Sequence, residues 1–308
     1  MSALPAPPAL GLGTWKSAPG EVGSAVRAAL ELGYRHIDCA SIYGNESEIG
    51  QALADACRDG VVQRDQLWIT SKLWNDCHAP EQVRPALLRS LKDLQLEQLD
   101  LYLIHWPVVH RPGVLMPEQA SDQIPLEQLP LSQTWTAMEA LVDEGLVRQI
   151  GVSNCSVPKL AELLQHSRLR PAMNQVERHP WLQQNALLGF CQQEGIGLTA
   201  YAPLGSPASE GEAPLLSDPT ITAIASHHGA TAAQVLLAWG MATGSAVIPK
   251  SVRRERLASN LEALELRLRP EDLQHIAALD RQQRFVDGRF WELPGGPYNC
   301  AELWDEPI

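Results

Sequence analysis

The chain has 308 residues, of which 24 are Lys or Arg and 36 are Asp or Glu, so its formal net charge is −12. This length exceeds that of a small disulfide-stabilised module and suits one large α/β domain or two smaller ones. The acidic balance argues against a nucleic-acid surface or an anionic membrane as the main partner, because both attract positive charge.

The cysteines and the amino terminus bear on the compartment. The six cysteines are scattered without a C-x-x-C pair, so we expect reduced thiols rather than a disulfide framework. The amino-terminal stretch lacks a positive region and a long apolar run, so it does not predict a signal peptide. No segment approaches the roughly 18 apolar residues of a membrane span. We therefore expect a soluble, cytoplasmic protein.

Short apolar runs alternate with stretches of helical spacing along the chain. The runs predict strands over residues 10–13, 35–37, 67–70, 101–104, 149–152, 173–176, 197–200 and 246–248. The stretches between them predict helices over residues 21–32, 46–58, 81–94, 131–144, 158–166, 183–194 and 231–242. Eight strands alternating with helices in about 250 residues predict an α/β fold, the (β/α)8 TIM barrel. Periodicity alone leaves an open doubly wound sheet as the alternative.

Three segments interrupt this alternation. Residues 107–131 hold five prolines and residues 203–219 hold four, and proline opposes both helix interiors and central strands. Loops of this length in a compact domain are usually functional, and both follow strand ends, so we expect lids over a site. The tail from residue 285 is the third irregular segment. No linker marks a boundary, which predicts a single domain over residues 1–308.

Polar and aromatic residues occur where each predicted strand ends. Because the carboxyl ends of barrel strands meet at one mouth, these residues are expected to line one pocket. In chain order they are Thr14 and Trp15, Asp38, Lys72 and Trp74, His105 and Trp106, Ser153 and Asn154, Gln175, Tyr201, and Lys250 and Ser251.

Several longer segments, taken in order, resemble the aldo-keto reductase family over essentially the whole chain. They are Leu12-Gly-Thr-Trp15, Gly33-Tyr-Arg-His-Ile-Asp38, Tyr43-Gly-Asn-Glu46, Ser71-Lys-Leu-Trp74, Asp100-Leu-Tyr-Leu-Ile-His-Trp-Pro107, Ile150-Gly-Val-Ser-Asn154 and Ile248-Pro-Lys-Ser251. The resemblance implies a catalytic tetrad of Asp38, Tyr43, Lys72 and His105. It also implies a monomeric barrel that uses NADPH to reduce aldehydes, and some ketones or sugars, to alcohols.

The chemistry of these four side chains agrees with that role. A free tyrosine has a pKa of about 10 and is a reluctant proton donor at neutral pH. Lys72 is expected to lower the pKa of Tyr43, and Asp38 to keep Lys72 charged and in place. His105 can donate a hydrogen bond to a carbonyl oxygen, while Tyr43 protonates the developing alkoxide as a general acid. A histidine at position 105, where steroid double-bond reductases of the family carry a glutamate, favours carbonyl reduction.

A cluster of cations predicts where an anionic cofactor binds. Residues 250–256 carry four of them at an expected helix start, where the partial positive charge disfavours cations unless an anion is bound. By resemblance, Lys250, Ser251 and Arg256 grip the adenosine 2′-phosphate, which predicts NADPH rather than NADH. The sequence departs from many family members at Ser259, in place of a glutamate, so the adenine contact is expected to be looser.

The resemblance assigns the remaining cofactor contacts. Ser153, Asn154 and Gln175 would hold the carboxamide, Tyr201 would stack on the nicotinamide, and Asn260 would contact the adenine. Leu204, Gly205 and Ser206 would cover the pyrophosphate. Contacts are also expected from Thr14, Trp15, Asp38 and Val252.

Aromatic residues near the strand ends predict an apolar substrate pocket. Trp15, Trp74 and Trp106 would line it beside Tyr43 and His105. Further candidates are Trp181, Phe290, Trp291 and Tyr298.

Other functions remain open from the residues. Gly151-Val-Ser-Asn-Cys155 nearly matches a hydrolase nucleophile elbow, but Cys155 stands where that turn needs a glycine. No metal-ligand spacing occurs, so no metal is expected. The serious alternative is a regulatory or structural protein that binds NADPH on the same fold with little turnover.

Overall fold

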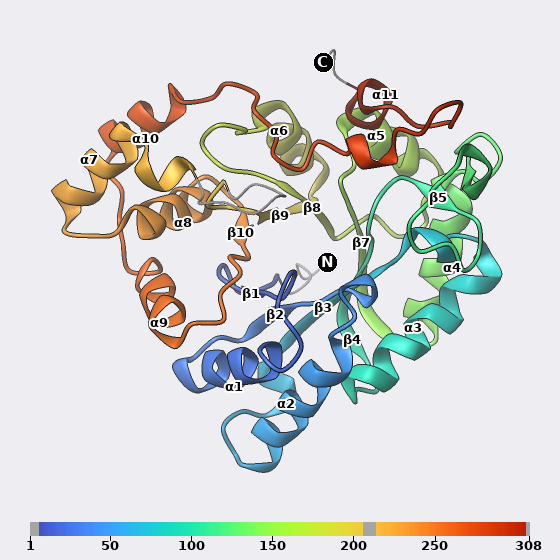
Figure 1. Ribbon diagram of the computed structural model, residues 1–308, viewed down its shortest axis with the longest axis horizontal. Helices are drawn as coiled ribbons and strands as arrows, with labels where there is room; N and C mark the ends of the chain where they lie inside the picture. Colours follow the sequence, from blue (N-terminus) through green and yellow to red (C-terminus); the bar gives the residue numbers. More distant parts are fainter. Residues whose placement is uncertain (1–5, 206–213, 306–308) are drawn as a thin grey trace.

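The structure is a computed structural model that describes residues 6–205 and 214–305. Eight parallel strands form one sheet whose neighbours follow chain order (Figure 1). They are β1 Leu12–Gly13, β2 His36–Asp38, β3 Trp68–Leu73, β4 Leu99–Ile104, β7 Val147–Ser153, β8 Met173–Glu177, β9 Gly197–Tyr201 and β10 Ala246–Val247.

Backbone contacts between the first and last strands close this sheet into a barrel. Gly11 N donates to Val247 O at 2.8 Å, and parallel bridges join Leu10 to Val247 and Gly13 to Lys250. An open doubly wound sheet would leave these two edges apart. The predicted (β/α)8 barrel is therefore confirmed, and each of the predicted strands is present within a few residues.

Helices form the outer ring around the strands (Figure 1). They are α1 Val22–Leu32, α2 Glu46–Arg58, α3 Pro80–Leu94, α4 Leu131–Asp143, α5 Val157–His166, α6 Asn185–Glu194, α7 Pro219–His228, α8 Ala232–Ala242, α9 Arg254–Glu262, α10 Pro270–Ala277 and α11 Cys300–Trp304. The sequence did not predict α7, α10 or α11. Asp218 begins α7 by accepting hydrogen bonds from the backbone N–H groups of Thr220 and Ile221.

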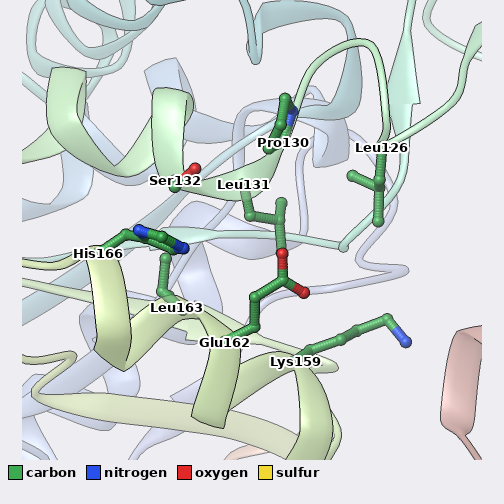
Figure 2. Close-up of a pocket in the computed structure, with 8 residues that line it drawn as sticks. All are labelled: Leu126, Pro130, Leu131, Ser132, Lys159, Glu162, Leu163 and His166. Carbon is green, nitrogen blue, oxygen red and sulfur yellow. The ribbon is translucent and has the colours of Figure 1, made fainter.

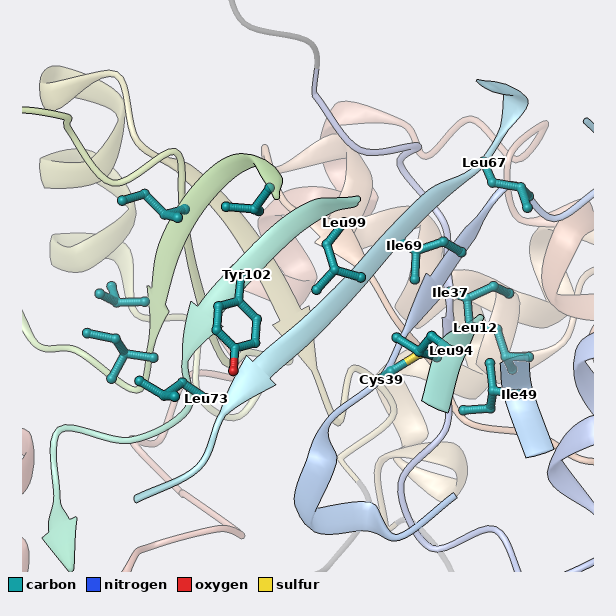
Figure 3. Close-up of a cluster of buried hydrophobic side chains, with 14 of the residues drawn as sticks. Leu12, Ile37, Cys39, Ile49, Leu67, Ile69, Leu73, Leu94, Leu99 and Tyr102 are labelled. Atoms are coloured by element: carbon teal, nitrogen blue, oxygen red, sulfur yellow. The ribbon is translucent and has the colours of Figure 1, made fainter. Parts of the chain in front are cut away.

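The main core lies between the barrel and this ring. In Figure 3, apolar side chains of the strands, such as Ile37, Ile69 and Leu99, gather with Ile49 and Leu94 of the helices. Strands β3 and β4 are buried along their whole length, as expected for parallel strands covered on both sides. Because both faces of these strands are packed, the residues at their carboxyl ends are held in fixed positions.

The proline-rich segment 107–131 is more regular than predicted. It contains a small antiparallel pair, β5 Val109–His110 and β6 Gln123–Ile124. Tyr298 of the tail joins this pair, because its hydroxyl accepts from Val109 N at 2.9 Å and donates to Ile124 O at 2.6 Å. The tail is also less irregular than predicted, since it contains α11, which lies beside α5 (Figure 1).

Two expectations about the whole chain can be compared with the structure. All six cysteines are free thiols, as predicted. Among the helices that the structure describes, none is long and apolar enough to cross a membrane.

Candidate active site

A buried ion pair lies at the carboxyl ends of β2 and β3. Lys72 Nζ lies 2.5 Å from Asp38 Oδ1 and also donates to Cys39 O at 2.8 Å. Burial by itself would lower the pKa of this lysine, but Asp38, together with Tyr43 and Cys39, more than offsets burial, so the pKa of Lys72 is raised above its ordinary value of 10.5. Lys72 is therefore a permanent positive charge inside the barrel at neutral pH.

Tyr43 reaches this charge from the short helical turn Ser41–Tyr43 that follows β2. Lys72 Nζ lies 3.5 Å from the Tyr43 hydroxyl and 5.2 Å from the centre of its ring. Burial raises the pKa of Tyr43 from 10 to about 12, although Lys72 lowers it. Lys72 thus lowers the pKa of Tyr43 as predicted, but no sequence pattern measures the larger, opposite effect of burial, which prevails because losing water costs the phenolate more than Lys72 returns.

His105 completes the group as the first residue after β4. Its ring lies edge-on to Tyr43, with 5.8 Å between ring centres, and edge-on to Trp74 at 5.0 Å. Burial and the charge of Lys72 hold the pKa of His105 well below 6.5. The imidazole is therefore neutral at pH 7 and has one N–H to donate. All four residues of the predicted tetrad are thus brought together.

The other polar residues at the strand ends form a hydrogen-bond network around Asp38 and His105. Gln175 Nε2 donates to Asp38 Oδ2 at 2.7 Å. Tyr201 donates to Asn154 Oδ1 at 2.8 Å, and Asn154 Nδ2 donates to His105 O at 3.0 Å. These bonds fix the side chains predicted to face a nicotinamide.

Two further predicted residues belong to this network. Thr14 Oγ1 donates to Asp38 O at 2.8 Å, which ties β1 to the ion pair. Ser153 Oγ donates to Gln175 O at 2.7 Å and is buried. A hydroxyl committed to a backbone carbonyl is poorly placed as a nucleophile, which further disfavours the hydrolase interpretation.

The predicted phosphate site lies between β10 and α9. Arg254, the first residue of α9, pairs with Glu31 at 2.8 Å. Lys250 and Arg256, in contrast, are exposed and pair with no carboxylate of the described residues. Ser251 is buried, and no side chain caps α9, so the N–H groups at its start can meet an anion. Val252, which follows Ser251, is half-buried.

The predicted adenine contacts are engaged within the protein. Asn260 is buried in α9, and Tyr34 donates to the carbonyl of Leu257 in the same helix at 3.0 Å. Gln234 Nε2 donates to both the carbonyl, at 2.9 Å, and the hydroxyl, at 3.3 Å, of Ser259. These bonds hold α9 against α1 and α8.

The segment predicted to cover a pyrophosphate is described only in part. Leu204 and Gly205 follow β9, and Gly205 has a φ of +68°. A Cβ there would meet Leu215 Cδ1, so both backbone angle and space favour glycine. Ser206 lies outside the described residues.

Aromatic side chains gather next to His105. Trp74 and Trp106 are buried with Trp291 of the tail, each with 5.8 Å between its ring centre and that of Trp291. Phe290 packs on Trp106 but stays 43% exposed, and Trp15 is 42% exposed. Trp74 and Trp106 thus form one aromatic wall with Trp291 of the tail, whereas Trp15 is not part of this cluster.

Two residues predicted as substrate contacts, Trp181 and Tyr298, have other roles in the structure. Trp181 packs in a different cluster with Leu215 and Trp239. Tyr298 is in the tail cluster, but its hydroxyl is used by β5 and β6. We therefore remove Trp181 from the candidates for the wall and regard Tyr298 as structural.

A surface pocket between two of the outer helices contains none of the predicted site residues. It lies between the start of α4 and one side of α5 (Figure 2), lined by Leu126, Pro130, Leu131, Ser132, Lys159, Glu162, Leu163 and His166. Among residues 6–205 and 214–305, no group of three or more His, Cys, Asp or Glu side chains is placed to hold a metal ion.

Sequence reasoning missed the residues that hold the Tyr43 turn. Asn45 Nδ2 donates to Thr14 O at 3.0 Å. Glu46 is buried and accepts hydrogen bonds from Ser71 Oγ at 2.5 Å and Ser90 Oγ at 2.8 Å. The signal for this role was the position of Glu46, three residues after Tyr43 and on the same face of the predicted helix as the apolar Ile49 and Leu53.

The fold and the site together define a class, a parallel eight-stranded barrel with a buried Lys–Asp pair, a tyrosine and a neutral histidine at its mouth. Comparison with known proteins gives the family. The sequence profile of the aldo/keto reductase family matches residues 9–281. The chain is 54% identical over 305 residues to an aldo/keto reductase of Synechocystis sp., covering 97% of this chain and 93% of that protein.

More distant relatives agree with this match. Human aldo-keto reductase family 1 member A1 is 45% identical over 285 residues, covering 91% of this chain and 88% of that protein. The solved structure of aldose reductase from Giardia lamblia has a TM-score of 0.88 at 42% identity and covers 94% of this chain and 98% of its own. This chain therefore belongs to the aldo/keto reductase family of oxidoreductases, which act on small carbonyl compounds and generally use NADPH.

Proposed function

We propose that this protein reduces aldehydes, and some ketones or sugars, to alcohols with NADPH, and that Tyr43 is the general acid. The observation that carries the proposal is the placement of the Tyr43 hydroxyl 3.5 Å from a lysine that is itself paired with Asp38 inside the barrel. A permanent cation beside a buried phenol is suited to stabilising the phenolate that forms when the proton leaves.

The protonation states of Tyr43 and His105 suit proton transfer from Tyr43 to the substrate oxygen. Because burial keeps the pKa of Tyr43 at about 12, the phenol holds its proton until an alkoxide forms next to it. Lys72 then offsets the negative charge left on the oxygen. His105, neutral at pH 7, can donate its N–H to the carbonyl oxygen and orient the substrate without competing as an acid.

The donor set fits the cofactor. Lys250 and Arg256 are exposed and pair with no carboxylate of the described residues, and with Ser251 they would hold the 2′-phosphate of NADPH, since both charges and helix N–H groups favour a dianion. Ser153, Asn154, Gln175 and Tyr201 would hold the nicotinamide end, with contacts from Thr14, Trp15 and Asp38. When bound, NADPH supplies the hydride.

The aromatic residues beside His105 indicate the class of substrate. Trp74 packs on His105 and belongs to one buried cluster with Trp106 and Trp291. Phe290 packs on Trp106 and leaves apolar surface exposed beside this cluster. We propose aldehydes with an apolar or aromatic body as the preferred substrates. By the family resemblance we also propose a cytoplasmic monomer, which size-exclusion chromatography and cell fractionation would check.

Turnover separates this proposal from a protein that binds NADPH without catalysis. The purified protein is mixed with NADPH or NADH and 4-nitrobenzaldehyde, and loss of the reduced cofactor is followed by absorbance. We expect turnover with NADPH and a much higher KM for NADH. Tight NADPH binding with no turnover over a series of aldehydes would support the regulatory alternative instead.

A further inference from the structure

A carboxylate that the proposed reaction does not use lies at the end of β8. Glu177 is fully buried and accepts three hydrogen bonds. Its Oε1 accepts from His179 Nε2 at 2.8 Å and from Phe285 N at 2.7 Å, and its Oε2 accepts from Val286 N at 2.7 Å. One barrel side chain therefore holds two successive backbone N–H groups at the beginning of the tail.

The tail continues from this point to the aromatic wall. Val286 is buried in the same cluster as Trp291, and Trp291 packs on Trp74, which packs on His105. Trp304 Nε1 donates to Asp287 O at 2.6 Å, so the end of the tail folds back on its beginning. The position of residues 285–287 thus sets the position of the aromatic rings farther along the tail.

A second set of contacts joins this anchor to the loop after β9. The Phe285 ring lies 5.2 Å from that of His179, centre to centre. A Cβ built on Gly205 would lie 3.3 Å from Phe285 Cε2, so the ring reaches the segment proposed to cover the pyrophosphate. Glu177 therefore stands where the cofactor side and the substrate side of the mouth meet.

We propose that Glu177 is a positioning residue for substrate selectivity, which fixes the tail so that its aromatic side chains form one wall of the substrate site. This inference rests on the proposed function. A glutamine has one oxygen and one N–H2 group in place of two acceptor oxygens. In Glu177→Gln the new N–H2 must face at least one donor, so at least one of the three bonds is lost.

The first test compares two aldehydes that differ in how far they extend toward the tail. For naphthaldehyde, Glu177→Gln should raise KM about tenfold, the size expected when one hydrogen bond to a charged group is lost. For propanal, which is too small to reach the tail, kcat/KM should stay within about twofold. Equal losses for both aldehydes, or no loss for either, would overturn the proposal.

A matched control separates positioning from general destabilisation. Glu139 on α4 is also buried, and its Oε1 accepts from two successive backbone N–H groups, Arg168 N at 2.7 Å and Leu169 N at 2.8 Å. Those residues precede β8, at the barrel end opposite Glu177. Glu139→Gln should lower the melting temperature comparably and leave the ratio of kcat/KM for the two aldehydes unchanged.

A second measurement does not need activity. In hydrogen exchange of the full-length protein, the amides of Phe285 and Val286 should exchange at least about tenfold faster in Glu177→Gln than in Glu139→Gln or wild type. If Glu177→Gln does not fold, His179→Phe removes one donor only and should shift exchange and KM in the same direction by less. Unchanged exchange at 285–286 would refute the anchor, whereas a wild type without turnover would refute only the proposed function.

Discussion

The Asp38–Lys72 pair gives the sharpest stability prediction. Asp38→Asn removes the counter-ion of an ammonium that is fully buried and 2.5 Å away. Removing one partner of a buried pair costs about 3–5 kcal/mol, because the other charge is left without water or partner. At about 2–4 °C per kcal/mol, the melting temperature should fall by roughly 6–20 °C. Activity should fall as well, since Lys72 then loses its fixed position.

The direction in which the pKa of Lys72 is shifted decides the pH at which the stabilities of wild type and Asp38→Asn are compared. The pKa of Lys72 is raised above 10.5 in the folded protein, so the pair contributes fully below that pH and its contribution fades only as the pH rises further. Thermal unfolding followed by circular dichroism at neutral pH therefore measures the whole effect.

Two controls make the prediction refutable. Glu144→Gln breaks the exposed Arg84–Glu144 pair and should cost at most about 1 kcal/mol. The double variant Asp38→Asn with Lys72→Met should be more stable than Asp38→Asn alone, because no uncompensated charge remains. The reasoning fails if Asp38→Asn costs no more than Glu144→Gln, or if the double variant is the less stable one.

Two further predictions concern the cofactor and pH. Arg256→Met should weaken NADPH binding about 10- to 100-fold and leave NADH binding nearly unchanged. Arg254→Met removes an arginine that is already paired with Glu31, so it should change the affinity for either cofactor little. Fluorescence titration measures the two affinities, and equal effects of the two variants would contradict the phosphate assignment. Burial lowers the pKa of His36 from 6.5 to about 4, so the unfolded chain takes up a proton that the folded protein refuses and stability falls as the pH drops from 6.5 to about 4. In urea unfolding over that range, His36→Gln should show a slope smaller by about 1.4 kcal/mol per pH unit, and an unchanged slope would show that His36 is not buried in its neutral form.

The barrel and the position of its site were predictable because strand ends are marked in the sequence. Short apolar runs followed at once by Asp38, His105 or Tyr201 indicate where each strand stops, and parallel topology brings those ends together. The signals for α7 and α10 were also present and were missed. Asp218 and Arg269 each precede a proline at the first position of a helix, a common helix start.

Other features depend on contacts between distant segments. The pKa of Tyr43 is governed by how much protein covers it, which no local pattern reports. Trp181 packs with Leu215 and Trp239 rather than with the aromatic wall, a contact that no local pattern around residue 181 reports. Glu177 closes β8, a strand that already holds Asn174 and Gln175, so its acidic side chain gave no distinct local signal. The two backbone N–H groups that it holds lie more than a hundred residues away in the chain.

The central claim is that Tyr43 donates the proton to the reduced carbonyl. The most direct measurement is the rate of NADPH oxidation with 4-nitrobenzaldehyde by wild type and Tyr43→Phe, with NADPH affinity measured for both. We predict that Tyr43→Phe binds NADPH as wild type does and loses about 10²–10⁴ in kcat, the contribution of a positioned general acid. A Tyr43→Phe variant that keeps the wild-type kcat would contradict the assignment.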